Sequence, residues 1–295
     1  MGTLIQDVRY ALRGLAKARG FAVVALLSLA IGIGANTAIF SIVNTLLLRP
    51  LPYKDANRLA ILWNRSPGLG ITEDWFSTAQ YFDIKTGHHG FEDVAIAIGG
   101  NENLTSDGQP ERVGTIHVSS NLLPMLGATA DKGRLFVSSE DVKGSPGTAV
   151  LSYGMWVRRY GSDPKVIGKS LTINGSTYQV IGILPRSFSL PREVLPTLGG
   201  AEQAEILLPL PMEPDAPQNR DHEDYNIMAK LKPGVSLQQA QAEMNTITAR
   251  LRRDFPANYP PNGGLTFGIV PLSEQVVVTA APHCLFCNSP SHSFC

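Results

Sequence analysis

The longest hydrophobic stretch of the chain runs from Phe21 to Leu48 and contains no charged side chain. Apolar runs of about 18 or more residues are typical of membrane-spanning helices, because the core of a globular domain uses shorter ones. At roughly 1.5 Å per residue, a helix over 21–48 would be about 42 Å long, whereas the hydrocarbon layer is about 30 Å thick. We therefore predict a transmembrane helix over 21–48 that either tilts or ends outside the bilayer.

The segment before this run is amphipathic. Its apolar side chains recur at Leu4, Val8, Ala11, Leu12 and Leu15, and its cationic side chains recur on another face at Arg9, Arg13 and Lys17. This pattern indicates a helix in the headgroup layer of a membrane, although an ordinary cytosolic helix has the same pattern. The excess of cations over the single anion Asp7 favours a cytoplasmic N-terminus. We predict an interfacial amphipathic helix over 1–20 at the inner membrane, with the main domain on the periplasmic or extracytoplasmic side.

A cleaved signal peptide is the alternative interpretation of the N-terminus. The basic segment would be long for a signal peptide, and the apolar run is about twice the usual length of roughly 7 to 15 residues. No small-x-small cleavage site follows the run. These features favour an uncleaved anchor in contact with membrane lipid.

Small and polar side chains repeat within the apolar run at helical spacing. We predict that this face packs against another helix through Ser28, Gly32, Gly34, Asn36, Thr37 and Ser41. Polar groups that face lipid would lack hydrogen-bond partners, and small residues let helices approach closely. Glycine and alanine are also common in spanning helices that have no such role. The chain offers no second apolar run of spanning length, so the partner helices would come from another chain or from another copy of this one.

Short strand-like and helix-like segments alternate beyond Pro50 and Pro52, which end the helix. Strands are predicted over 58–63, 94–98, 112–118, 148–151, 170–173, 177–183, 205–210 and 225–231. Helices are predicted over 77–85, 121–126 and 152–160, and after Ser236. We expect a mixed α/β (α+β) domain over 50–275, built from two subdomains that join near 190–220, where prolines and acidic residues concentrate.

Two local signals in this domain are especially clear. Asn174-Gly175 separates two apolar runs and predicts a β-hairpin with a type I′ turn, because both residues tolerate positive φ. Ser236 is followed three residues later by Gln239, which is the pattern of a capping box at the start of a helix. An apolar stripe then extends along that helix as far as Leu251.

The chain contains none of the sequence motifs that mark common catalytic sites. It has no phosphate-binding loop, no nucleophile elbow, no zinc-protease helix and no kinase signature. The net charge is zero, which gives no global electrostatic footprint for nucleic acid. His88 and His89 lie in a turn flanked by glycines and are interpreted as surface histidines. Residues 221–224 are interpreted as a solvated loop rather than a metal site, because adjacent residues rarely converge on one ion. We therefore expect no enzyme activity, no cofactor and no nucleic-acid partner.

The C-terminal residues carry all the cysteines of the chain. Cys284, Cys287, His292 and Cys295 have a spacing similar to that of a small zinc site. The composition changes abruptly after about residue 277, the last spacing is tight for a zinc knuckle, and no secondary structure is predicted around these residues. We therefore expect an aberrant or disordered tail over 277–295 and no metal.

Several short motifs, in order, resemble the MacB-like permeases of ATP-binding-cassette systems, including the acidobacterial-type orphan permeases. They comprise residues 7–13 (DVRYALR), 32–40 (GIGANTAIF), 48–53 (LRPLPY), 151–168 (LSYGMWVRRYGSDPKVIG), 178–182 (YQVIG) and 231–236 (LKPGVS). The resemblance covers residues 1 to about 275. It implies a first transmembrane helix, a periplasmic core domain without catalytic residues, and a separate ATPase subunit that drives the membrane helices.

The chain departs from the family pattern after about residue 275, where such permeases continue into further helices. We expect a truncated, non-catalytic permease component of an ATP-driven transporter, whose periplasmic domain relays motion or handles substrate. A stand-alone, membrane-anchored periplasmic binding or sensing module is the alternative. A tethered extracytoplasmic enzyme is the third reading, and the missing catalytic motifs argue against it.

Overall fold

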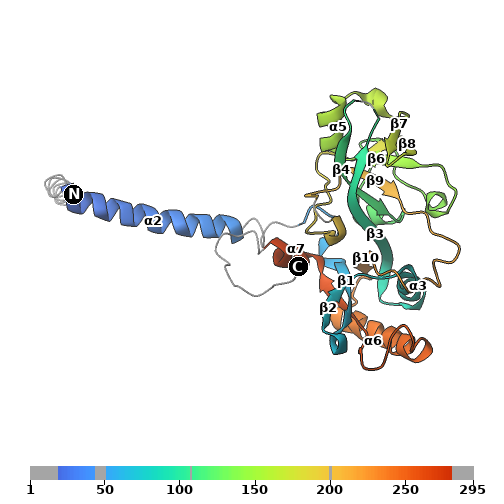
Figure 1. Ribbon diagram of the computed structural model, residues 1–295. Coiled ribbons are helices and arrows are strands. Elements are labelled where there is room, and N and C mark those ends of the chain that lie inside the picture. The colour runs from blue at the N-terminus through green and yellow to red at the C-terminus, as the bar shows by residue number, and fades with distance from the viewer. Residues whose placement is uncertain (1–18, 44–50, 107, 199–200, 281–295) are drawn as a thin grey trace. The chain divides into compact units, whose positions relative to one another are not determined.

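The computed structural model describes residues 19–43, 51–106, 108–198 and 201–280 of the chain (Figure 1). Contacts divide the chain into two compact units, Met1–Pro50 and Leu51–Cys295. Residues 1–18 of the predicted interfacial helix lie outside the described residues. So do residues 281–295 of the predicted tail, and with them the cysteines and His292. Residues 277–280 lie in a helix, Leu272–Ala280, and the predicted boundaries of the domain and the tail stay predictions.

The described part of the first unit is one helix, α2 (Arg19–Val43). Large apolar side chains are exposed along it, among them Val24, Leu26 and Ile31. Within the described residues, none of the helices has the length and apolar character needed to cross a membrane. The transmembrane helix expected over 21–48 therefore stays a prediction.

The second unit is built on one mixed sheet, whose strands in the described residues follow the order β11-β1-β10-β3-β4-β9-β6-β8-β5, with β2 beside β1 and β7 beside β3 and β8. The strands are β1 (Leu59–Ser66), β2 (Ile71–Asp74), β3 (Phe91–Leu104), β4 (Glu111–Val118), β5 (Lys132–Gly133), β6 (Thr148–Leu151), β7 (Ser170–Ile173), β8 (Ser176–Ile183), β9 (Ile206–Pro209), β10 (Asn226–Leu231) and β11 (Thr266–Pro271). The helices are α3 (Thr78–Gly87), α4 (Leu122–Met125), α5 (Tyr153–Tyr160), α6 (Leu237–Asp254) and α7 (Leu272–Ala280). Short 3₁₀ turns include η2 (Ala56–Arg58), η4 (Ser138–Asp141) and η6 (Pro196–Leu198). The mixed α/β fold expected from the sequence is confirmed.

Strand β3 runs through most of the length of this unit (Figure 1). Residues 91–97 pair with β10, and residues 97–104 pair with β4. We call the region of α3, α6, β1, β10 and β11 the α6 end, and the region of α5 and β6–β8 the α5 end. The two ends therefore share one continuous strand.

Three hydrophobic clusters fill this unit. One at the α6 end contains Phe76, Phe91, Met244 and Phe267. One at the α5 end contains Leu151, Met155, Trp156 and Val180. A third cluster, which we call the central cluster, contains Leu59, Ile116, Leu198 and Leu272 and takes the alternate residues of β3, β6, β9 and β10, so it lies on the opposite face of the sheet from the other two. The division into two subdomains near 190–220 stays a prediction, because contacts split the chain only at Pro50.

Local sequence signals appear in the structure as expected. Asn174 and Gly175 have φ of 48° and 82° and join β7 to β8. Ser77 with Gln80 and Ser236 with Gln239 form capping boxes at the starts of α3 and α6. Strand β3 is longer than predicted because it continues past Gly99 and Gly100, and strands β2, β5 and β11 were missed.

Candidate functional site

The predicted helix-packing residues all lie within α2. The side chains of Ser28, Asn36 and Thr37 are exposed, and a Cβ added to Gly32 or Gly34 would meet no atom within 4 Å. The side chain of Ser41 lies outside the described residues. The role of this face in helix packing stays a prediction.

An ion-pair network holds the start of the second unit to the sheet. Arg58 pairs with Asp55 at 2.6 Å and with Glu92 at 2.5 Å, and it donates to the carbonyl of Leu231 at 2.8 Å. The buried Lys230 contacts the same two carboxylates at 2.9 and 3.5 Å. Hydrogen bonds from Lys230 and Arg58 lower the pKa of Asp55, so this carboxylate stays charged. The network fixes η2 to β3 and β10.

The last described helix packs beside this start. Leu272 of α7 is buried in the central cluster, and Leu51 and Val276 pack against the same cluster. The indole of Trp63 on β1 donates to Gln275 Oε1 at 3.0 Å. The first and last described segments of the second unit therefore pack on the same hydrophobic cluster.

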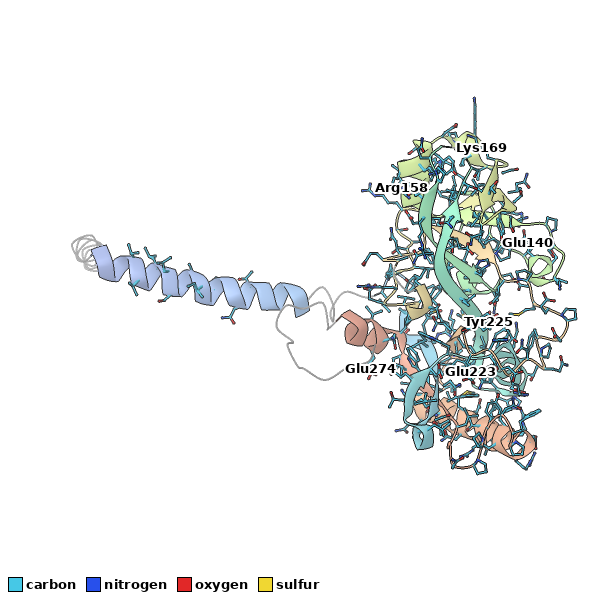
Figure 2. All side chains as sticks on the ribbon, viewed as in Figure 1. Glu140, Arg158, Lys169, Glu223, Tyr225 and Glu274 are labelled. Carbon is cyan, nitrogen blue, oxygen red and sulfur yellow. The ribbon has the colours of Figure 1, made fainter. Side chains whose placement is uncertain are left out.

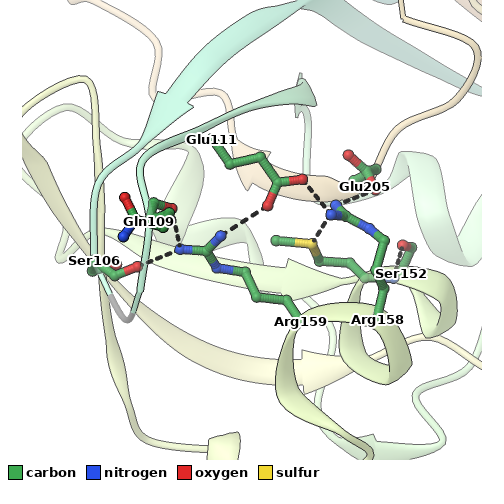
Figure 3. A network of polar contacts seen from close by, with 8 residues as sticks. Ser106, Gln109, Glu111, Ser152, Arg158, Arg159 and Glu205 are labelled. Atoms are coloured by element: carbon green, nitrogen blue, oxygen red, sulfur yellow. Dashed lines mark hydrogen bonds and ion pairs between the residues drawn. The ribbon is translucent and has the colours of Figure 1, made fainter.

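A second polar network lies at the α5 end and ties α5 to the β3–β4 hairpin (Figure 3). Glu111 accepts hydrogen bonds from Arg158 and, at 2.8 Å, from Arg159. Arg158 also donates to Glu205 at 2.8 Å, and Arg159 donates to the carbonyls of Ser106 and Gln109 at 2.7 and 3.2 Å. Burial acts to raise the pKa of Glu111, but the two guanidinium groups outweigh it and lower that pKa. The network satisfies its charges internally and offers no free catalytic group.

A cavity of about 280 Å³ lies where β4, β8 and β9 meet the turn after η4. His117, Glu140 and Tyr178 contribute to its lining. Both ring nitrogens of His117 lie 3.4 Å from oxygens, Nδ1 from the carbonyl of Pro209 and Nε2 from Glu102. The charge of Glu140 is matched by Arg134, which binds it through two nitrogens at 3.0 and 3.1 Å. Among the described residues, the contacts of the His117 ring are to Pro209 and Glu102 and not to a hydroxyl group.

The histidine turn after α3 is less exposed than the sequence suggested. His89 is exposed, as expected, but His88 is partly buried and lies 5.3 Å from the ring of Phe91. Burial lowers the pKa of His88. Glu243 of α6 accepts hydrogen bonds from the backbone N–H groups of His89 and Gly90 at 2.9 and 2.8 Å. The turn therefore anchors α6 through its backbone.

The acidic loop before β10 was predicted to be solvated, and this is wrong for one residue. Asp221, His222 and Asp224 are exposed, but Glu223 is partly buried and lies at the α6 end (Figure 2). Its Oε1 accepts hydrogen bonds from Asn64 and Gln80, both at 2.8 Å. These partners lie far away in the sequence, so no local pattern could have revealed them. Among the described residues, no group of three or more His, Cys, Asp and Glu side chains is arranged to hold a metal.

Comparison with known proteins places this arrangement in a family. The family model for the MacB-like periplasmic core domain matches residues 22–247, which is more than half of the chain. Among solved structures, a domain of a permease protein from Porphyromonas gingivalis has 18% identity and a TM-score of 0.55, covering 74% of this chain and 92% of that one. The periplasmic region of MacB from Actinobacillus actinomycetemcomitans has 12% identity and a TM-score of 0.53, covering 84% of this chain and 100% of that one. Among curated proteins, none matches. At these identities the solved structures show a common fold, and the family match confirms the resemblance seen in the sequence motifs. The chain belongs to the family of proteins with a MacB-like periplasmic core domain.

Proposed function

We propose that this chain is a non-catalytic permease component of an ATP-driven transporter, anchored in the inner membrane by residues 21–48. The observation that supports this most is the family match over 22–247. The matched region includes both the apolar segment and most of the folded domain. The uncharged run and the exposed apolar side chains of α2 are suited to lipid contact. The cationic residues before the run favour a cytoplasmic N-terminus and a periplasmic domain.

The domain is suited to relaying motion. Its first and last described segments, at Leu51 and Val276, pack on the same central cluster. Strand β3 then connects that region to the α5 end through continuous hydrogen-bonded pairing. Because packed interiors deform little, a displacement imposed at this cluster would move the sheet as a body. The energy would come from a separate ATP-binding-cassette ATPase, and further membrane helices from another chain or another copy.

Topology is tested by alkaline extraction and external proteolysis of membranes that contain the full chain. We expect the protein to stay with the membrane at high pH. Protease added outside the inner membrane should digest residues beyond 50. Recovery of soluble protein with a new N-terminus near residue 35 would contradict the anchor.

Partnership is tested by affinity purification of the full chain from membranes, followed by detection of a bound ATP-binding-cassette ATPase. Gly32→Leu and Gly34→Leu place bulk on the predicted packing face and should abolish recovery of the ATPase, because close helix approach needs small residues. Val24→Leu is the matched control, since it adds bulk to an apolar position outside the set of packing residues. If the wild-type chain is membrane-bound but never recovers an ATPase, the stand-alone binding or sensing module is the better account.

A further inference from the structure

Three oxygen-bearing side chains gather at the α6 end around Glu223. Asn64 on β1 lies opposite Asp74 on β2 in the strand register. Asn64 and Gln80 both donate to Oε1 of Glu223, at 2.8 Å each, so Oε2 receives neither of these hydrogen bonds. The group brings together a strand pair, the first turn of α3 and the loop before β10.

In the described part of the chain, the side chains that act on the pKa of Glu223 include no cation. Burial raises the pKa of Glu223, and the nearby carboxylate of Asp74 raises it further, while the two neutral amides only partly offset this. A buried carboxylate beside a second carboxylate is costly unless it takes up a proton or a cation. Glu223 therefore sits where positive charge would stabilise the fold.

Asn64 provides an independent sign of a missing partner. The residue is only 3% exposed, and its Oδ1 is buried without a hydrogen-bond partner among the described residues. Leaving such an acceptor unsatisfied costs about 1–3 kcal/mol. Rotating the amide by half a turn would place Oδ1 against Oε1 of Glu223, and two acceptors repel each other unless Glu223 is protonated. The oxygen belongs to the same amide whose nitrogen contacts Glu223, on the residue that lies opposite Asp74 in the strand register.

We propose that Asp74, Glu223 and Oδ1 of Asn64 are the protein ligands of a hard divalent cation of the calcium class. Carboxylate and amide oxygens are the donors that such cations prefer, and two carboxylates match a double positive charge. Calcium accepts irregular oxygen sites more readily than magnesium, which demands near-octahedral geometry. With few protein ligands, the expected dissociation constant is about 10⁻⁴–10⁻³ M, the range of extracellular calcium modules. This site is independent of ATP-driven transport.

The test uses terbium, a luminescent substitute for calcium, with the full chain purified in detergent. Trp75 follows Asp74 in the chain, and its ring centroid lies 5.2 Å from that of Trp63, so two neighbouring indoles are available to sensitise an ion bound at Asp74. Excitation of tryptophan should give terbium emission that calcium displaces. Trp75→Phe should reduce the emission but leave the calcium-dependent rise in Tm unchanged, which separates the reporter from the site.

Glu223→Gln and Asp74→Asn should each lower the calcium affinity at least tenfold. Asp224→Asn is the matched control, because it removes the same charge from an exposed neighbour in the same loop. Circular dichroism verifies that each variant is folded. A wild-type chain that shows neither terbium emission nor a calcium-dependent rise in Tm up to about 10 mM, ten times the upper limit of the expected range, overturns the proposal. If, in that case, Glu223→Gln also raises the free energy of unfolding, the wild-type Glu223 carboxyl holds a proton and does not bind a cation.

Discussion

Gln241 on α6 bonds to the edge strand β11 as a neighbouring strand would, donating to the carbonyl of Phe267 at 2.7 Å. It also accepts from the N–H of Ile269 at 3.1 Å, so a single side-chain amide takes the place of one peptide group of a paired strand. In the described part of the sheet, β11 is a terminal strand that pairs with β1. Exposed strand edges invite pairing with other chains, and covering them is a common protection.

We predict that Gln241→Ala destabilises the domain by about 1–3 kcal/mol, because a backbone donor and acceptor lose their partners. The exposed Gln238 on the same helix provides the control, and Gln238→Ala should change the free energy of unfolding by less than about 0.5 kcal/mol. Urea unfolding measures both values. Equal stability of the two variants would mean that Gln241 does not protect the edge.

The adjacent glycines of β3 provide a matched pair for testing how closely η6 packs on the sheet. A Cβ at Gly99 would lie 2.8 Å from both the Cα and the N of Leu198, whereas a Cβ at Gly100 would meet nothing within 4 Å. We expect Gly99→Ala to cost about 1–3 kcal/mol through overpacking against backbone. Gly100→Ala should be neutral or stabilise by up to about 1 kcal/mol, because it restricts the unfolded chain. Thermal unfolding of the two variants measures both effects. A Gly99→Ala variant more stable than Gly100→Ala would refute the close approach of η6 to Gly99.

These glycines also explain why β3 is longer than its sequence predicts. Gly99 and Gly100 look like the end of a strand, so a strand ending at residue 98 was predicted. In the structure their neighbours on β4 continue the ladder through Leu104, and this pairing overrides the low strand propensity of glycine. Signals within a few residues, such as the Asn174-Gly175 turn and the capping box of Ser236, were predicted correctly because their chemistry is local.

The candidate sites needed the tertiary structure. The loop of residues 221–224 looked solvated, because nothing near it in sequence pointed to Asn64 or Gln80 as partners of Glu223. Strand β11 was missed because Gly268 and Pro271 interrupt a short apolar run that is stabilised by β1 and by Gln241. The family resemblance predicted the domain, but it carried no information about these contacts.

The two arginines of α5 should contribute unequally to the network at the α5 end. The side chain of Arg159 is 9% exposed and that of Arg158 is 47% exposed. We expect Arg159→Met to cost about 1.5–3 kcal/mol, because charged hydrogen bonds to Glu111 and to the hairpin carbonyls are lost. Arg158→Met should cost less than about 1 kcal/mol, because solvent screens its ion pairs. Hydrogen exchange at Thr105, whose N–H donates to the carbonyl of Thr172 at 2.9 Å next to this loop, should become faster only in the Arg159 variant.

Stability should depend on pH through Glu223 when the protein is kept in a chelator. The pKa of this carboxyl is raised above its ordinary value of 4.5 in the folded state, mainly by burial. The folded state then holds its proton more tightly than the unfolded state does. The contribution of Glu223 to stability is therefore fully present below about pH 4.5 and is lost as the pH rises through the folded pKa. Glu223→Gln removes this titration and keeps an oxygen for Asn64 and Gln80. We expect the variant to exceed the wild type in free energy of unfolding at pH 7, with the difference closing toward pH 4 in urea titrations. A difference that is constant over this range would show that the Glu223 carboxyl titrates normally in the folded domain.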